Sequence, residues 1–359
     1  IIMAAVTAAM VKELRESTGA GMMECKKALT ETDGDMEAAV DVLRKSGAAK
    51  VEKKAGRIAA EGIAKVAIDG NTAVVVEVNS ETDFVAKNAI FQEFVQAVAD
   101  KALKAPVDKA GDGEDVCAIL GMQSELEEKT LTIGEKLSLR RFQKITGDCV
   151  ASYIHGGGRI GVLVAGNGAS DDAAKEALTN IAMQIAAMNP QYISRDEISA
   201  DELAKMKEIT IDSALNDPFS LPKPVLSKLI EKAVAGVWSA EDVAIYEEKK
   251  SNMNFLPNFL SKEAKAQLAE IACADKEEIS GNKIFSGLVE GRISKQMKEI
   301  CLLDQVYVKA EDGKQTVAAY LKSVNPALKI AKFVRFEVGE GMEKKNEDFA
   351  AEVAKQMNV

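Results

Sequence analysis

The chain has 359 residues, of which 47% are hydrophobic and 28% charged, so we expect it to fold and to bury substantial cores. At about 150 residues per domain, its length predicts two or three domains. Acidic residues outnumber basic residues by 56 to 46, and the formal charge of −10 argues against direct nucleic-acid binding. The five cysteines contain no CxxC pair, which argues against a disulfide framework or a zinc site and fits a reducing cytoplasm.

The chain lacks the sequence features of a membrane or secreted protein. Its first residues are apolar, but no basic residue precedes them as in a signal peptide. No apolar run approaches the length of a membrane span. We therefore expect a cytoplasmic protein with no membrane partner, whose natural first residue is Met3.

The first part of the chain carries three short helical patterns separated by glycine-rich turns. Three helices at this spacing predict a small helical domain of the bundle kind over residues 3–56. Met22 and Met23 follow the first glycine turn, where such adaptable side chains either pack inward or meet another protein. We expect core packing for at least one of them. The basic stretch 44–57 is expected to be a solvated connection.

The next region contains a repeated pattern. Residues 61–78 (EGIAKVAIDGNTAVVVEV) and 150–166 (VASYIHGGGRIGVLVAG) each hold two alternating runs around a glycine-containing turn, which is the signal of a β-hairpin. An amphipathic helical pattern follows each of them. The tandem predicts an α+β fold of antiparallel sheets backed by helices, with two related core subdomains at 57–140 and 141–205. It argues against a doubly wound parallel sheet.

Residues 206–290 differ in character from the core. Helical patterns interrupted by four prolines predict a helical insertion here. Strand-like runs at 305–310 and 332–338 predict that the chain returns to the second core subdomain over residues 291–338. An amphipathic pattern within 339–359 predicts a C-terminal helix.

Motifs of the common enzyme classes are weak or missing. The string GGGRIG at 156–161 matches the GxGxxG pattern, but a strand follows it where a dinucleotide site needs a helix. His155 is the single histidine, which argues against a Ser-His triad, an HExxH metalloprotease and most zinc hydrolases. We therefore expect no catalytic residue, cofactor or metal, and a protein that acts by binding.

The pair Asp83-Phe84 stands where a strand-like run gives way to a helical pattern, in the string NSETDFVAKNAI (79–90). Phe84 could extend the buried helical face that carries Phe91. Ser80 and Asp83 also fit a capping signature, in which Asp83 would serve the start of a helix. From the residues alone, burial of Phe84 and its presentation to a partner both remain open.

Four strings resemble the elongation factor Ts family in order and spacing: LRESTGAGMMECKKAL (14–29), EVNSETDFVAKN (77–88), SYIHGGGRIGVLV (152–164) and FVRFEVGEG (333–341). The resemblance implies a guanine-nucleotide exchange factor that binds elongation factor Tu with GDP, promotes GDP release and binds no nucleotide itself. It also implies a ubiquitin-associated-like N-terminal domain, two core subdomains, a coiled-coil protrusion and a C-terminal helical module.

The same resemblance implies which residues contact the partner. Its Asp-Phe pair corresponds to Asp83 and Phe84, which would reach the nucleotide domain of elongation factor Tu near its switch region and disturb its magnesium site. The other implied contacts are Thr82, Val85, His155, Arg15, Met22 and Met23. Residues of roughly 215–284 exceed the shorter members of the family, so the resemblance does not imply the shape of the protrusion.

Two other classes of function stay open beside the resemblance. The first is a ubiquitin-associated-like adaptor that acts through residues 3–56, with the core as a scaffold. The second is a ribosome- or RNA-binding protein that uses the basic residues Lys50, Lys53, Lys54 and Arg57.

Overall fold

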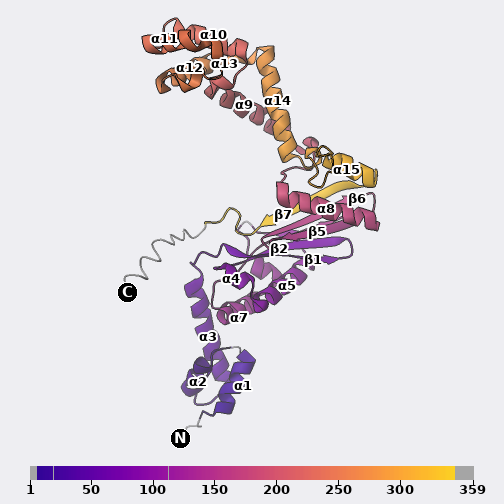
Figure 1. The fold of residues 1–359 in the computed structure, drawn as a ribbon. Coiled ribbons are helices and arrows are strands. Elements are labelled where there is room, and N and C mark those ends of the chain that lie inside the picture. Colours follow the sequence, from indigo (N-terminus) through magenta and orange to yellow (C-terminus); the bar gives the residue numbers. More distant parts are fainter. Residues whose placement is uncertain (1–5, 19, 112, 344–359) are drawn as a thin grey trace. The chain divides into compact units, whose positions relative to one another are not determined.

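The computed structural model describes residues 6–18, 20–111 and 113–343. It divides into two compact units, one formed by Ile1–Asn189 with Ala319–Val359 and the other by Pro190–Ala318. The first unit combines helices with antiparallel sheets, and the described part of the second is built mainly of helices (Figure 1). The predicted α+β class is therefore confirmed. The six-part division given above stays a prediction.

The N-terminal helices are α1 (Ala8–Thr18), α2 (Met22–Glu31) and α3 (Met36–Lys54). Their shared core contains Leu14, Cys25 and Leu29, each 0% exposed. The predicted helical N-terminal region is thus confirmed. The basic stretch differs from expectation, because most of it is the second half of α3. Its alanines and lysines are good helix formers, and they continue the helix that the capping Asp35 starts.

The first sheet has the strand order β1-β2-β4-β3, with β1 (Glu61–Asp69), β2 (Thr72–Ser80), β3 (Lys109–Ala110) and β4 (Ser138–Thr146). The predicted first hairpin is present, since β1 and β2 pair antiparallel and Gly70 turns between them with a φ of 57°. One face of this sheet packs against α5 (Ala89–Leu103) through Phe91 and Phe94. Shorter helices complete this layer: α4 (Asp83–Ala86), α6 (Val116–Leu120) and α7 (Gln123–Ile133).

The second sheet has the order β5-β6-β7, with β5 (Cys149–His155), β6 (Ile160–Asn167) and β7 (Lys329–Glu337). The turn at 156–158 joins β5 to β6, and its three glycines have φ between 57° and 104°. The GxGxxG match is therefore a hairpin turn, as its context predicted. The run at 332–338 is confirmed as a strand, since it forms most of β7, and α8 (Asp172–Met188) packs against β5 and β6.

The two sheets pack against each other through the faces that the helices leave uncovered. Val75, Leu163 and Phe336 belong to the apolar core between them. Glycine allows close approach here, because a Cβ at Gly161 would lie 2.9 Å from a methyl group of Val75. The strands that run between the flanking helices are visible in Figure 1.

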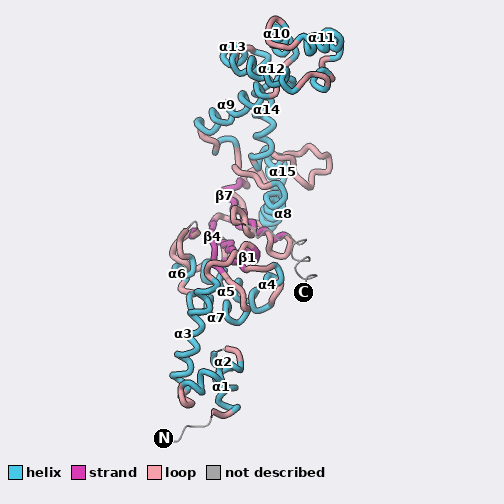
Figure 2. The backbone as a smooth tube through the Cα atoms, turned by 90° about the vertical axis from the view of Figure 1, so that its left-hand side faces the viewer, coloured by secondary structure: helices cyan, strands magenta, loops and turns pink. Residues whose placement is uncertain are grey.

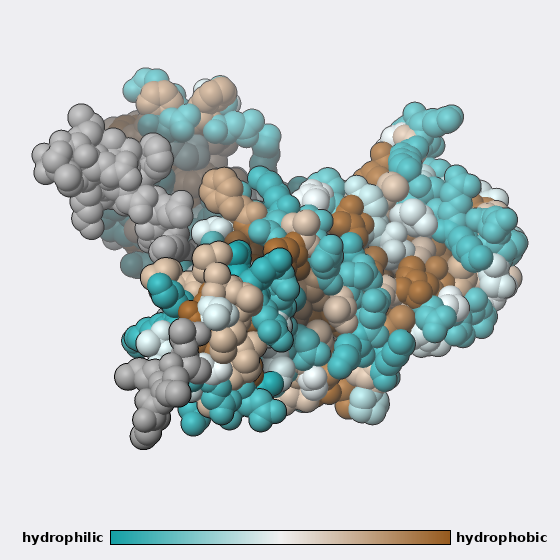
Figure 3. Space-filling model, turned by 90° about the horizontal axis from the view of Figure 1, so that it is seen from below, coloured by the Kyte–Doolittle hydropathy of each residue, from teal (hydrophilic) through white to brown (hydrophobic). Residues whose placement is uncertain are grey.

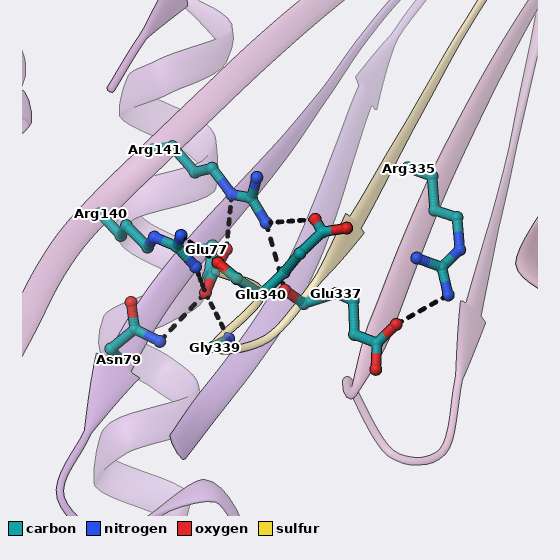
Figure 4. A network of polar contacts seen from close by, with 8 residues as sticks. All are labelled: Glu77, Asn79, Arg140, Arg141, Arg335, Glu337, Gly339 and Glu340. Carbon is teal, nitrogen blue, oxygen red and sulfur yellow. Dashed lines mark hydrogen bonds and ion pairs between the residues drawn. The ribbon is translucent and has the colours of Figure 1, made fainter. Parts of the chain in front are cut away.

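A buried ionic network also joins the sheets (Figure 4). The carboxylate of Glu77 on β2 is 0% exposed and pairs with Arg140 at 2.9 Å and Arg141 at 2.6 Å, both on β4. It also accepts hydrogen bonds from the Asn79 side chain and, at 2.8 Å, from the backbone N–H of Gly339, just after β7. Glu77 therefore ties the first sheet to the chain that leaves the second.

Gly339 and Gly341 offer a matched test of this connection. Both have positive φ, 73° and 71°, so alanine at either position costs about 1–2 kcal/mol of backbone strain. A Cβ at Gly339 would lie 2.3 Å from the carbonyl oxygen of Ala60, whereas nothing lies within 4 Å of one at Gly341. We expect Gly339→Ala to lower the free energy of unfolding clearly more than Gly341→Ala in urea denaturation. Equal losses would contradict the close packing at Gly339.

The second unit contains α9 (Ala200–Asn216), α10 (Lys223–Val234), α11 (Ala240–Lys249), α12 (Lys262–Ala274), α13 (Lys276–Ser280) and α14 (Lys283–Ile300), and α15 (Val317–Val324) begins at its end. Figure 2 shows these helices joined by loops. They enclose their own core around Leu229, Leu268 and Phe285. The strand expected at 305–310 is absent, since Val306 makes a single bridge to Thr316. The expected C-terminal helix lies largely outside the described residues.

Candidate partner-binding site

The turn after β2 holds its two central side chains in opposite directions. Val85 is 7% exposed and packs into the core below the turn, while Phe84 is 78% exposed. The helix α5 begins separately, because Asn88 caps it by accepting from the N–H groups of Ile90 and Phe91. Phe84 and Phe91 therefore do not share one helical face, and burial of Phe84 is excluded. Val85 anchors the turn from inside the core, and its contact with a partner stays a prediction.

Asp83 is exposed as well. The suggested capping pair does not form, since Thr82 precedes the first residue of α4 and the Ser80 hydroxyl donates to the Thr82 carbonyl at 3.0 Å. The Asp83 carboxylate lies 3.8 Å from the ammonium of Lys87, and both side chains are largely in solvent. Such a pair contributes about 0–1 kcal/mol, so little opposes a new contact of Asp83.

The backbone before Phe84 is held by Glu135, which the sequence did not single out. One carboxylate oxygen of Glu135 accepts from the N–H groups of Glu81 at 3.1 Å and Thr82 at 3.0 Å. The other accepts from the Thr82 hydroxyl at 2.7 Å. Thr82 is thus an anchor of the turn. No local pattern could have indicated this contact, because the two segments are 53 residues apart.

His155 lies at the end of β5, exposed, with its Nδ1 3.1 Å from the Tyr153 hydroxyl. The turn beside it rests on β1, since the N–H of Ala64 donates to the Gly158 carbonyl at 2.7 Å. The register pairs Glu61 at the start of β1 with Ser80 at the end of β2. The fold therefore brings His155 and the Asp83-Phe84 turn to the same end of the first hairpin.

The remaining residues implied by the resemblance lie on the N-terminal helices and not at this end of β1. Arg15 is exposed on α1, and Met22 and Met23 are 57% and 74% exposed at the start of α2. The expectation that at least one methionine packs inward is therefore wrong. The reason is that Cys25, Ala28 and Leu29 supply the inward face of α2. Met23 borders a shallow surface with Lys26 and Lys27.

Three buried cysteines have raised pKa values. Burial raises the pKa of Cys117 to about 11 and also raises the pKa values of Cys149 and Cys301, so these thiols stay protonated near neutral pH. Within the described ranges, no three His, Cys, Asp or Glu side chains gather in a way that could hold a metal ion. None of the described helices has the length and apolar character to cross a membrane.

Exposed aromatic, methionine and arginine side chains are enriched in protein–protein interfaces. Figure 3 shows apolar side chains among hydrophilic ones on one face of the molecule. The fold and the site thus define an α+β protein with the features of a binding factor.

A family model described as elongation factor TS matches residues 81–340. The curated elongation factor Ts of Clostridioides difficile (strain 630) is 43% identical over 369 residues, which cover 99% of this chain and 100% of that protein. The chain therefore belongs to the elongation factor Ts family of translation elongation factors.

Proposed function

We propose that this chain binds elongation factor Tu with GDP and promotes the release of GDP and its exchange for GTP. It does so by binding alone, with no catalytic residue, cofactor, metal or nucleotide of its own. The observation that carries the proposal is the 78% exposure of Phe84 on a turn whose backbone is anchored on both sides. A large apolar side chain exposed to water on an anchored backbone is unfavourable for a chain without a partner and useful for one that inserts it.

The mechanism follows from how a GTPase holds its nucleotide. Backbone amides, a lysine and Mg²⁺ bind the phosphates, and the switch segments help to hold the metal. Insertion of the Phe84 ring beside those segments would move them and weaken the metal site, while Asp83 makes polar contacts at the same place. No proton transfer is needed. By linkage, nucleotide weakens the binding of the factor as much as the factor weakens the binding of nucleotide, so incoming GTP displaces it.

The other exposed residues supply further contacts in this proposal. His155 adds a contact from the neighbouring hairpin turn. Arg15, Met22 and Met23 form a separate contact on the N-terminal helices, which we propose to be a ubiquitin-associated-like domain. We further propose two related core subdomains, a coiled-coil protrusion and a C-terminal helical module, with the limits predicted from the sequence.

The alternatives are less well supported by the contacts of this chain. The exposed methionines would also suit an adaptor, but they leave the anchored Phe84 without a role. The RNA-binding alternative depends on basic residues, of which Lys54 donates to the Gly134 carbonyl and Arg57 pairs with Glu81 at 3.1 Å. Part of that positive charge is therefore used inside the chain.

The test is the release of fluorescently labelled GDP from elongation factor Tu, with excess unlabelled GDP as the chase. We expect the chain to accelerate release in a saturable way. A buffer blank and the heat-denatured chain serve as controls. Binding of the chain without any acceleration would favour the adaptor. No effect and no binding would refute the proposal.

A further inference from the structure

We propose that Glu135 is a positioning residue that sets the direction of Phe84, an inference that rests on the proposed function. Its three hydrogen bonds end at Glu81 and Thr82, directly before the pair Asp83-Phe84. Thr82 has the extended backbone of a helix N-cap, but its side chain makes no cap hydrogen bond, and its hydroxyl donates to Glu135 instead. The side chain of Glu135 thus anchors the backbone just before α4 from a distant segment of the chain.

Phe84 needs such an anchor because its own ring is not held by packing. The ring is 78% exposed, so its direction depends on the backbone that carries it. Two constraints act on that backbone: Val85 packs into the core on one side of Phe84, and Glu135 holds the turn on the other. Hydrogen bonds to a carboxylate are about twice as strong as neutral ones, which suits a position at the rim of the core.

The segment that carries Glu135 is itself held by hydrogen bonds of the next residue, Lys136. The backbone N–H of Lys136 donates to the Glu81 carboxylate at 2.6 Å, and the Lys136 ammonium donates to the carbonyls of Ala55 at 2.6 Å and Arg57 at 2.9 Å. Gly134, with a φ of 87°, ends α7 and leads the chain into residues 135 and 136, which make these hydrogen bonds. The turn before Phe84 is therefore connected through residues 134–136 to the end of the N-terminal helical region.

The test compares three variants in GDP release over a range of chain concentrations. Glu135→Ala removes all three hydrogen bonds, and we expect the maximal release rate to fall about tenfold, because a misdirected group loses its productive geometry. The concentration for half-maximal release should change much less. Glu135→Gln keeps one acceptor oxygen for the two amides, and its NH₂ can donate to the Thr82 hydroxyl, so it should lose clearly less. Glu127→Ala removes an exposed charge from α7 and serves as the matched control.

A second measurement does not depend on elongation factor Tu. Hydrogen exchange of the Glu81 and Thr82 amides in the chain by itself should accelerate in Glu135→Ala and stay closer to wild type in Glu135→Gln. If Glu135→Ala fails to fold, Thr82→Val removes one of the three bonds in its place.

Unchanged amide exchange, or unchanged GDP release despite faster amide exchange, would overturn the inference. The inference would also be overturned if Glu135→Gln lost as much release rate as Glu135→Ala while its Glu81 and Thr82 amides stayed protected. The charge of Glu135, and not the position of the turn, would then determine the release rate. If the wild-type chain does not release GDP, the proposed function fails, and amide exchange still decides whether Glu135 fixes the turn.

Discussion

Replacement of Phe84 by alanine is expected to slow the chain-stimulated release of GDP by roughly thirtyfold, the rate equivalent of the 2 kcal/mol or more that an interface hot spot contributes. The stability of the chain should hardly change. The Phe84 ring is 78% exposed, so its removal leaves no cavity and takes little apolar surface out of contact. The measurement is the maximal rate of release at saturating chain, with the melting temperature from circular dichroism beside it.

Phe91→Ala is the matched control for this prediction. The same atoms are removed seven residues later in the chain, from a ring that is 0% exposed in the core beneath the first sheet. We expect a loss of about 3–5 kcal/mol in the free energy of unfolding. The release rate per folded molecule should stay near wild type. The two phenylalanines should thus show opposite patterns of stability and exchange.

Asp83→Ala extends the comparison to the neighbouring carboxylate. We expect slower release, and the double variant should lose less than the sum of the two single losses, because adjacent groups that act on one transition are coupled. A sharp fall in the melting temperature of Phe84→Ala with a normal release rate would contradict the proposed wedge. A normal rate with normal stability would leave Phe84 without a function in exchange.

The elements that the sequence predicted well are those whose signals are local. Both hairpins have alternating runs around glycine turns, and the φ of Gly70 and of the glycines at 156–158 shows why those residues are needed. The basic stretch 44–57 is dense in charge, which is typical of a solvated connection, but the helix propensity of its alanines and lysines makes most of it part of α3. The run at 305–310 alternates like a strand, but a strand also needs a neighbour to pair with, and Val306 has one bridge.

The candidate site could be predicted only in part, because local sequence signals do not determine all of its contacts. The pattern around residues 79–90 fits both a buried and an exposed Phe84, and the outcome depends on where α5 begins. That start is set by the Asn88 cap. Glu135 could not be found, since a single glutamate after a glycine has no distinctive local signal. Helical periodicity around Cys25 could have indicated the exposure of Met23, which points away from the inward face of α2. It could not have indicated the exposure of Met22, which lies three residues before Cys25 at the start of the helix.

Glu77→Gln is expected to lower the free energy of unfolding by about 3–5 kcal/mol, because it removes the buried partner of two arginines. The Glu77 carboxylate is 0% exposed and lies 2.9 Å from the guanidinium of Arg140 and 2.6 Å from that of Arg141. A neutral amide of the same shape leaves Arg140 without this counter-charge and leaves Arg141 with Glu340 alone, at 3.3 Å. It also weakens the acceptor for the N–H of Gly339, so the connection between the sheets should loosen at the point drawn in Figure 4.

The measurement has to report on the unit that contains Glu77. Trp238, the single tryptophan, lies in the other unit, so its fluorescence is unsuitable. Native-state hydrogen exchange of amides in β2 and β7 gives the opening free energy at the two sides of the network. Glu16→Gln, which breaks an exposed pair with Lys12, is the control and should change stability by at most about 1 kcal/mol. If Glu77→Gln matched that control, the network would be dispensable. The two sheets would then be held together by their apolar core alone. The positions of His155 and the Phe84 turn at the same end of β1 would not depend on the buried charges.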